Sequence, residues 1–154
     1  MIKEYFTKIA SFGPIGDSVL GKIIASVLAL PAIMFLNFID ERTPTCFWIL
    51  VFAVLLISIF AILFSQKDSE NRIIINSFIG TMLAFYGIAF NVKLGLIGLA
   101  LFHVFSFALP FFVFTKSKDL EEQEHSKFVR IIVISLAAGF TVNVFLRFVL
   151  WIVK

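Results

Sequence analysis

A small group of polar side chains interrupts otherwise apolar segments of this sequence. Asn76 and Ser77 lie in one segment, His103 and Ser106 in the next, and Ser135 in the last. Polar groups are costly in an apolar environment, so such residues mark a candidate site by default. Amide, imidazole and hydroxyl groups can hydrogen-bond a polar ligand, and His103 is also titratable. The alternatives are ordinary hydrogen bonds between helices, at about 0.6 kcal/mol each, and a neutral histidine whose hydrogen bonds are satisfied.

The composition shows which solvent surrounds these residues. Of the 154 residues, 60% are hydrophobic and 15% are charged, whereas a soluble domain averages roughly 45–50% apolar and about 25% charged. We therefore expect an all-α integral membrane protein. The single Cys46 excludes an internal disulfide and a thiolate metal cluster. The net charge of +3 is more typical of membrane topology than of nucleic-acid binding, and no nucleic-acid partner is expected.

Five apolar runs, each close to the roughly 20 residues that span a bilayer, are expected to position the polar side chains. They predict transmembrane helices at 23–39, 47–64, 73–90, 94–114 and 128–153. A short amphipathic helix over 1–12 precedes them, because Ile2, Tyr5, Phe6 and Ile9 share one helical face. It is expected to lie in the membrane interface, and the alternative is a helix packed on the rest of the protein. Residues 12–21 are rich in glycine and proline and predict a loop. The chain is interpreted as one membrane domain over residues 1–154.

The distribution of lysine and arginine predicts the orientation. Five spans place nine of these residues on the N-terminal side and four on the opposite side, so the N-terminus is expected in the cytoplasm. The nine are Lys3, Lys8, Lys22, Lys67, Arg72, Lys116, Lys118, Lys127 and Arg130, and the four are Arg42, Lys93, Arg147 and Lys154. Because helices alternate in direction, Ser26 and the five polar residues all fall in the cytoplasmic half. The acidic stretch 119–124 is interpreted as a solvated loop or short helix, without metal-ligand spacing.

The order of these features resembles the phosphatidylglycerophosphatase A family of small bacterial membrane enzymes. Asn76-Ser77-Phe78-Ile79-Gly80 lies where that family has Asp-Glu-Phe-Ile-Gly. Phe102-His103 with Ser106 and Pro110 lies where it has Phe-Arg, then Asp, then Lys-Pro. Residues 134–139 lie where it has Asp-Asp followed by Ala-Gly, and Ser11, Gly21, Ser26 and Pro31 follow its opening loop and first helix. The likeness covers most of the chain and implies a magnesium-dependent lipid phosphatase scaffold.

The departures from the family pattern affect the residues that would carry its chemistry. The family's acidic positions are Asn76, Ser77, Ser106, Ile134 and Ser135 here, and its arginine is His103. Magnesium is usually held by carboxylates and waters, and it commonly neutralises charge in phosphoryl transfer. No catalytic residue and no metal site are therefore expected, although Mg²⁺ would be the cofactor if the family activity survived. Asp17, Asp68 and Glu70 are the acids that could form a weak substitute site.

The resemblance and its departures together imply a degenerate family member in a bacterial inner membrane. We expect lost or much reduced phosphatase activity, with binding of an anionic phospholipid headgroup through Lys22, Ser26, Asn76 and His103. One alternative is an active phosphatase that converts phosphatidylglycerophosphate to phosphatidylglycerol with relocated groups. Another is a structural or assembly subunit with a membrane-protein partner. The resemblance requires that Asn76, His103, Ser106 and Ser135 converge in three dimensions.

Overall fold

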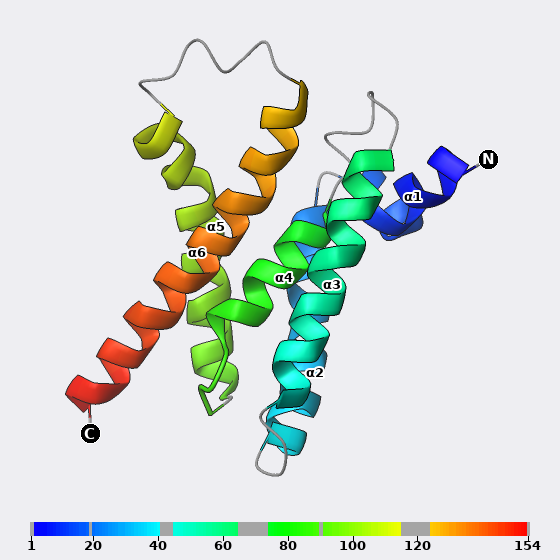
Figure 1. Cartoon of the computed structure of the whole chain (residues 1–154). Helices are drawn as coiled ribbons and strands as arrows, with labels where there is room; N and C mark the ends of the chain where they lie inside the picture. Colours follow the sequence, from blue (N-terminus) through cyan, green and yellow to red (C-terminus); the bar gives the residue numbers. More distant parts are fainter. Residues whose placement is uncertain are drawn as a thin grey trace.

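The computed structural model describes residues 2–18, 20–40, 45–64, 74–89, 91–114 and 124–153, and all regular elements in these ranges are helical (Figure 1). They are α1 (Ile2–Ala10), the 3₁₀ helix η1 (Gly13–Asp17), α2 (Gly21–Asp40), α3 (Thr45–Phe64), α4 (Ile75–Ala84), α5 (Val92–Phe114) and α6 (Glu124–Val153). The all-α fold expected from the sequence is confirmed for these residues. Four of the five predicted long helices begin two to four residues earlier than the apolar runs.

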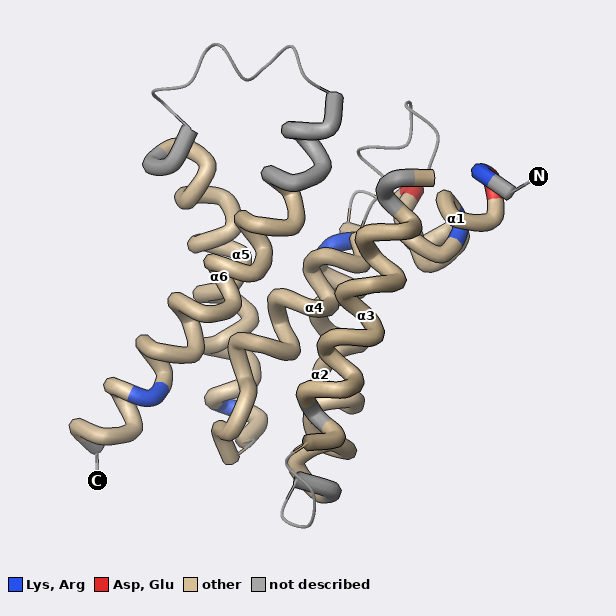
Figure 2. Tube along the Cα trace, in the orientation of Figure 1, with Lys and Arg blue, Asp and Glu red and all other residues tan. Residues whose placement is uncertain are grey.

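Three of the helices are long and apolar enough to cross a membrane, judged by length and composition. The stretches are Gly21–Phe38 in α2, Val92–Phe111 in α5 and Ile131–Ile152 in α6. The apolar stretches Trp48–Ala61 in α3 and Ile75–Ala84 in α4 are shorter. Figure 2 shows the described charged residues gathered toward two ends of the bundle, with an uncharged band between them.

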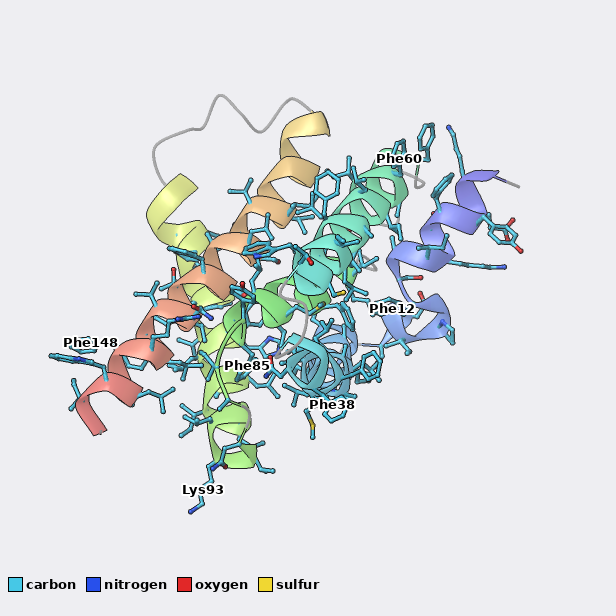
Figure 3. All side chains as sticks on the ribbon, turned by 60° about the horizontal axis from the view of Figure 1, so that its bottom comes forward. Phe12, Phe38, Phe60, Phe85, Lys93 and Phe148 are labelled. Atoms are coloured by element: carbon cyan, nitrogen blue, oxygen red, sulfur yellow. The ribbon has the colours of Figure 1, made fainter. Side chains whose placement is uncertain are left out.

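The core is built around α4, which is the shortest of these apolar helices and the most buried. Eight of its ten residues are buried, and it packs against α2 and α6 on opposite sides (Figure 1). Phe85, which follows α4, is fully buried and lies inside the bundle, whereas Phe38 and Phe148 point outward (Figure 3). Large apolar side chains such as Phe38 and Phe148 therefore lie on the outer surface and are not part of the core.

The helix predicted across 73–90 is only half as long in the structure. Helix α4 ends at Ala84, because the chain turns at residues 85–87 and Gly87 adopts a φ of +63°. Ten residues rise about 15 Å, half of the roughly 30 Å hydrocarbon core of a bilayer. Three distant side chains satisfy the carbonyl groups released by the break: Asn37 Nδ2 donates to Ile88 O, Asn143 Nδ2 to Ala84 O and Tyr86 O, and Arg147 Nη2 to Tyr86 O.

Helix α1 packs on the rest of the protein, which is the alternative that its amphipathic pattern left open. The Phe6 ring stacks on Phe64 of α3 at 5.3 Å between ring centroids, and Ala10 is buried. The Ile74 N–H donates to Ala10 O over 3.0 Å, so the end of α1 lies beside the start of α4. Tyr5 and Ile9 remain exposed on the outer face of α1.

Candidate functional site

Helices α4 and α6 run in parallel and touch through two glycines. A Cβ atom on Gly139 would lie 2.2 Å from Gly80 O, so the two backbones approach as closely as only glycine permits. One turn toward the N-terminal ends, Asn76 Nδ2 donates a hydrogen bond of 2.8 Å to Ser135 Oγ, and both residues are buried. Both pairs have the same sequence offset, so the glycine contact sets the register that brings the two polar side chains together.

Helix α5 runs antiparallel to α4 and closes the site from another side. A Cβ on Gly80 would lie 2.6 Å from Phe102 Cε2, and a Cβ on Gly98 would lie 2.4 Å from Phe85 Cζ. Each step of four residues along α5 therefore moves about one turn back along α4. Ser106 lies about one turn beyond Phe102 on α5. His103 directly follows Phe102 at the adjacent position of the helix.

Three polar atoms of this cluster are buried without a hydrogen-bond partner among the described residues. They are Asn76 Oδ1, His103 Nε2 and Ser106 Oγ. A buried donor or acceptor left unsatisfied costs about 1–3 kcal/mol, and buried polar groups in proteins are almost always paired with protein or with ordered water. Residues Asn76, Ser135, His103 and Ser106 are called the polar cluster below. Three of its polar atoms therefore keep free hydrogen-bonding capacity.

The remaining sequence-predicted residues lie around the polar cluster in different ways. Ser26 is buried, and its hydroxyl donates to Lys22 O within its own helix over 3.0 Å. Lys22 is exposed in the first turn of α2. Ser77 is buried beside Asn76, and Ile134 is half-buried beside Ser135. Ser26 and Lys22 thus belong to the first two turns of α2.

Carboxylates do not contribute to the polar cluster among the described residues. Those residues contain no group of three or more His, Cys, Asp or Glu side chains that could hold a metal ion. Asp17 is exposed in η1. Asp68, Glu70 and the side chains of the acidic stretch 119–124 lie outside the described residues. The neutral amide and hydroxyl oxygens can accept hydrogen bonds, but they cannot balance the charge of a magnesium ion beside a phosphate.

A second set of polar residues, at the other end of α4, was missed as a group by the sequence reasoning. It consists of Asn37, Asn143 and Arg147 bonded to the turn after α4, with Arg147 Nε donating to Asn143 Oδ1 over 2.9 Å. Trp48 Nε1 donates to the Tyr86 hydroxyl in the same region, over 3.1 Å. The sequence signal for the break after α4 was Gly87 inside an apolar run, because an isolated glycine argues against an unbroken helix.

Two apolar hollows on the surface are separate from the polar cluster. One, of about 370 Å³, lies between α1, α2, α3 and α4 and is lined by Ile9, Phe12, Leu28, Val54, Ile57, Ile75 and Phe78. The other, of about 430 Å³, is lined by Phe140, Thr141, Val144, Phe145 and Phe148 on α6. Neither lining includes a member of the polar cluster.

Comparison of the chain with models of protein families, with curated proteins and with solved structures finds no match. The function is therefore argued from the geometry of the polar cluster and of the helices that hold it.

Proposed function

We propose that this chain is a multi-pass protein of a bacterial inner membrane that binds the phosphate headgroup of an anionic phospholipid without hydrolysing it. The chain crosses the bilayer five times with its N-terminus in the cytoplasm. The third crossing is made by α4 together with the turn that follows it. The polar cluster is the headgroup site, with Lys22 as its cation. In this proposal the protein is a degenerate relative of the phosphatidylglycerophosphatase A family.

The distribution of surface residues supports insertion into a membrane. Large apolar side chains such as Phe38, Phe107 and Phe140 are between 69% and 79% exposed, which is costly in water and favourable in lipid. The described lysines and arginines lie toward the two ends of the bundle (Figure 2), where long cationic side chains reach the water interface. An apolar band bounded by charge on both sides is the surface that a bilayer requires.

The observation that carries the binding proposal is the unsatisfied polar atoms of the polar cluster. Asn76 Oδ1 is an acceptor, whereas Ser106 and a protonated His103 nitrogen are donors. A phosphate monoester or glycerol headgroup offers both acceptor oxygens and hydroxyl donors, which are the partners that these three atoms lack. Lys22 adds a positive charge that a lipid phosphate can approach from the surface.

Two features support a scaffold that is related to the phosphatase family but lacks its chemistry. The residues that match the family pattern, Gly80, Phe102 and Gly139, form the contact between α4, α5 and α6. The positions that match the family's acidic pairs include Asn76 and Ser135, which face each other beside that contact. A neutral pair in this place can hydrogen-bond a headgroup, but it supplies no metal ligand for phosphoryl transfer.

Lipid binding and stability together test the headgroup site. The double variant Asn76→Leu, Ser135→Ala removes a polar pair and an unsatisfied acceptor, and Ser58→Ala removes a buried hydroxyl that bonds only within α3. The purified variants are titrated with phosphatidylglycerol and phosphatidylglycerophosphate in nanodiscs of phosphatidylcholine. We expect the double variant to bind about tenfold more weakly, from the loss of one or two hydrogen bonds, while its stability is unchanged or higher. Ser58→Ala should bind like the natural protein.

Unchanged lipid binding with a clear loss of stability would refute the headgroup site, because the Asn76–Ser135 bond would then serve only helix packing. Such a result would favour the structural-subunit alternative.

Phosphate release from phosphatidylglycerophosphate tests the absence of catalysis. It is measured with and without magnesium for the natural protein and for a variant carrying Asn76→Asp, Ser77→Glu, Ser106→Asp, Ile134→Asp and Ser135→Asp. We expect no turnover by the natural protein and magnesium-dependent turnover by the variant. Magnesium-dependent release by the natural protein would overturn the proposal and point to acids elsewhere in the chain.

A further inference from the structure

Arg147 is held rigidly at the end of the molecule opposite to the polar cluster. It lies within the apolar stretch Ile131–Ile152 of α6. Its Nε donates to Asn143 Oδ1 over 2.9 Å, and its Nη2 donates to Tyr86 O over 3.0 Å. One bond is made within α6 and the other to the turn after α4. These two contacts on different segments fix the plane of the guanidinium group as well as its position.

The charge of Arg147 is not neutralised by a described carboxylate. Both of its hydrogen-bond partners are neutral, and the described acidic side chains, Glu4 and Asp17, belong to α1 and η1. A guanidinium has five N–H donors, and the two bonds use two of them. The residue is exposed, so the remaining donors can meet a ligand from outside the bundle. An arginine in an apolar stretch calls for an anionic partner.

The aromatic residues around Arg147 are those of a membrane–water interface. Trp48 and Tyr86 are hydrogen-bonded to each other, with ring centroids 4.9 Å apart. Trp151, one turn beyond Arg147, is 75% exposed. Tryptophan and tyrosine are enriched at the depth of the lipid headgroups. Lys93 lies in the first turn of α5, and Arg147 bonds to Tyr86, which precedes α5 by a few residues. At this depth the anion available to Arg147 is a lipid phosphate.

We propose that Arg147 forms a second anionic-lipid site, in the leaflet opposite to the polar cluster, and binds the phosphate of a phospholipid such as phosphatidylglycerol. A planar guanidinium with two parallel donors matches two phosphate oxygens, and its orientation is already fixed by Asn143 and Tyr86. Phosphatidylglycerol binds better than phosphatidylcholine, because no choline cation competes for its phosphate. The inference rests on the proposed membrane insertion, but it does not depend on the polar cluster.

Gly87 provides an independent way to disturb this site without removing its charge. A Cβ at Gly87 would lie 2.7 Å from Arg147 Nη2, at a φ of +63° that strains a side chain, so Gly87→Ala displaces the guanidinium group or the turn to which it bonds. The variant Arg147→Gln removes the charge but keeps an N–H donor for Tyr86 O. Arg147→Lys keeps the positive charge and loses the two parallel N–H donors of the guanidinium group. Lys93→Gln is the matched control, because it removes a cation from the same end of the molecule.

The experiment is native mass spectrometry of each purified variant released from nanodiscs that hold equal amounts of phosphatidylglycerol and phosphatidylcholine. For the natural protein we expect preferential retention of phosphatidylglycerol. Arg147→Gln should reduce the affinity about tenfold or more, as the loss of a charge-assisted hydrogen bond implies. Arg147→Lys and Gly87→Ala should cause smaller losses, and Lys93→Gln should change the affinity less than about twofold. If Arg147→Gln does not fold, Arg147→Lys and Gly87→Ala still decide the question.

Two results would overturn the inference. One is equal retention of phosphatidylglycerol by the natural protein and all Arg147 and Gly87 variants. The other is binding of inorganic phosphate at the Arg147 site without a preference for phosphatidylglycerol over phosphatidylcholine, because the site would then bind a free anion. The double variant Asn76→Leu, Ser135→Ala should keep the Arg147-dependent retention, so failure of the polar cluster is distinguishable from failure of this site.

Discussion

The contact between Gly80 and Gly139 is the most demanding point of the packing, and the variant Gly139→Ala tests it. The added Cβ would lie 2.2 Å from Gly80 O and 3.2 Å from Gly80 Cα. These are backbone atoms, so α4 and α6 must move apart because no side chain can rotate away. Overpacking of this kind costs about 1–3 kcal/mol. Separation of the helices also lengthens the Asn76–Ser135 hydrogen bond, which is worth about 1 kcal/mol.

One effect acts in the opposite direction, since alanine is a better helix former than glycine by about 1 kcal/mol. The net expectation is a loss of roughly 1–3 kcal/mol in the free energy of unfolding. The assay is reversible unfolding in mixed micelles, with Ala100→Leu as the control. Ala100 is exposed on α5, so a larger side chain at this position meets no neighbour and should leave the stability within about 0.5 kcal/mol.

A double-variant cycle separates the steric cause from a general loss of packing. If Gly139→Ala acts partly by pulling Asn76 away from Ser135, then Asn76→Leu and Gly139→Ala together should cost less than the sum of the two single changes. A stability of Gly139→Ala equal to that of the natural protein would refute the reasoning. It would mean that α4 and α6 are not in backbone contact at Gly80.

Two further predictions concern the break after α4 and the topology. Asn143→Leu should destabilise the protein by about 2–4 kcal/mol, because it removes hydrogen bonds to the carbonyl groups of Ala84 and Tyr86. Thr141→Val, which removes a bond within α6 alone, should cost less than about 1 kcal/mol. Equal unfolding free energies of the two variants would contradict this role of Asn143. In intact cells, a membrane-impermeant maleimide should label the exposed Cys46, whereas a Ser18→Cys variant in a Cys46→Ser background should react only after lysis. The reverse pattern would contradict a cytoplasmic N-terminus.

The long helices were predictable from the sequence because their cause is local. A run of about 20 apolar residues favours a helix that satisfies its own backbone groups, wherever the rest of the chain lies. Helices α2, α3, α5 and α6 accordingly begin and end within a few residues of the apolar runs. The alternating directions of consecutive spans also predicted that Asn76 and Ser135 lie in the same half of the bundle, and their hydrogen bond confirms that they meet.

The end of α4 was less predictable, since its local signal was Gly87 inside a largely apolar run. The helix stops where side chains from other helices donate hydrogen bonds to the released carbonyl groups. These side chains are Asn37, Asn143 and Arg147. No local pattern encodes that rescue. The break depends on side chains 50 or more positions away in the sequence, and only the packed bundle brings them to the turn.

The sequence by itself determined the apolar composition, the helical elements and the polar residues that stand out in the apolar runs. These follow from the composition and spacing of residues along one chain, where burial energies and helix geometry are local properties. The tertiary structure decided which polar groups are paired, which are left with free hydrogen-bonding capacity, and where α4 ends. Those outcomes depend on the register of the α4–α6 contact, which the close approach of Gly80 and Gly139 establishes between segments that are 59 residues apart.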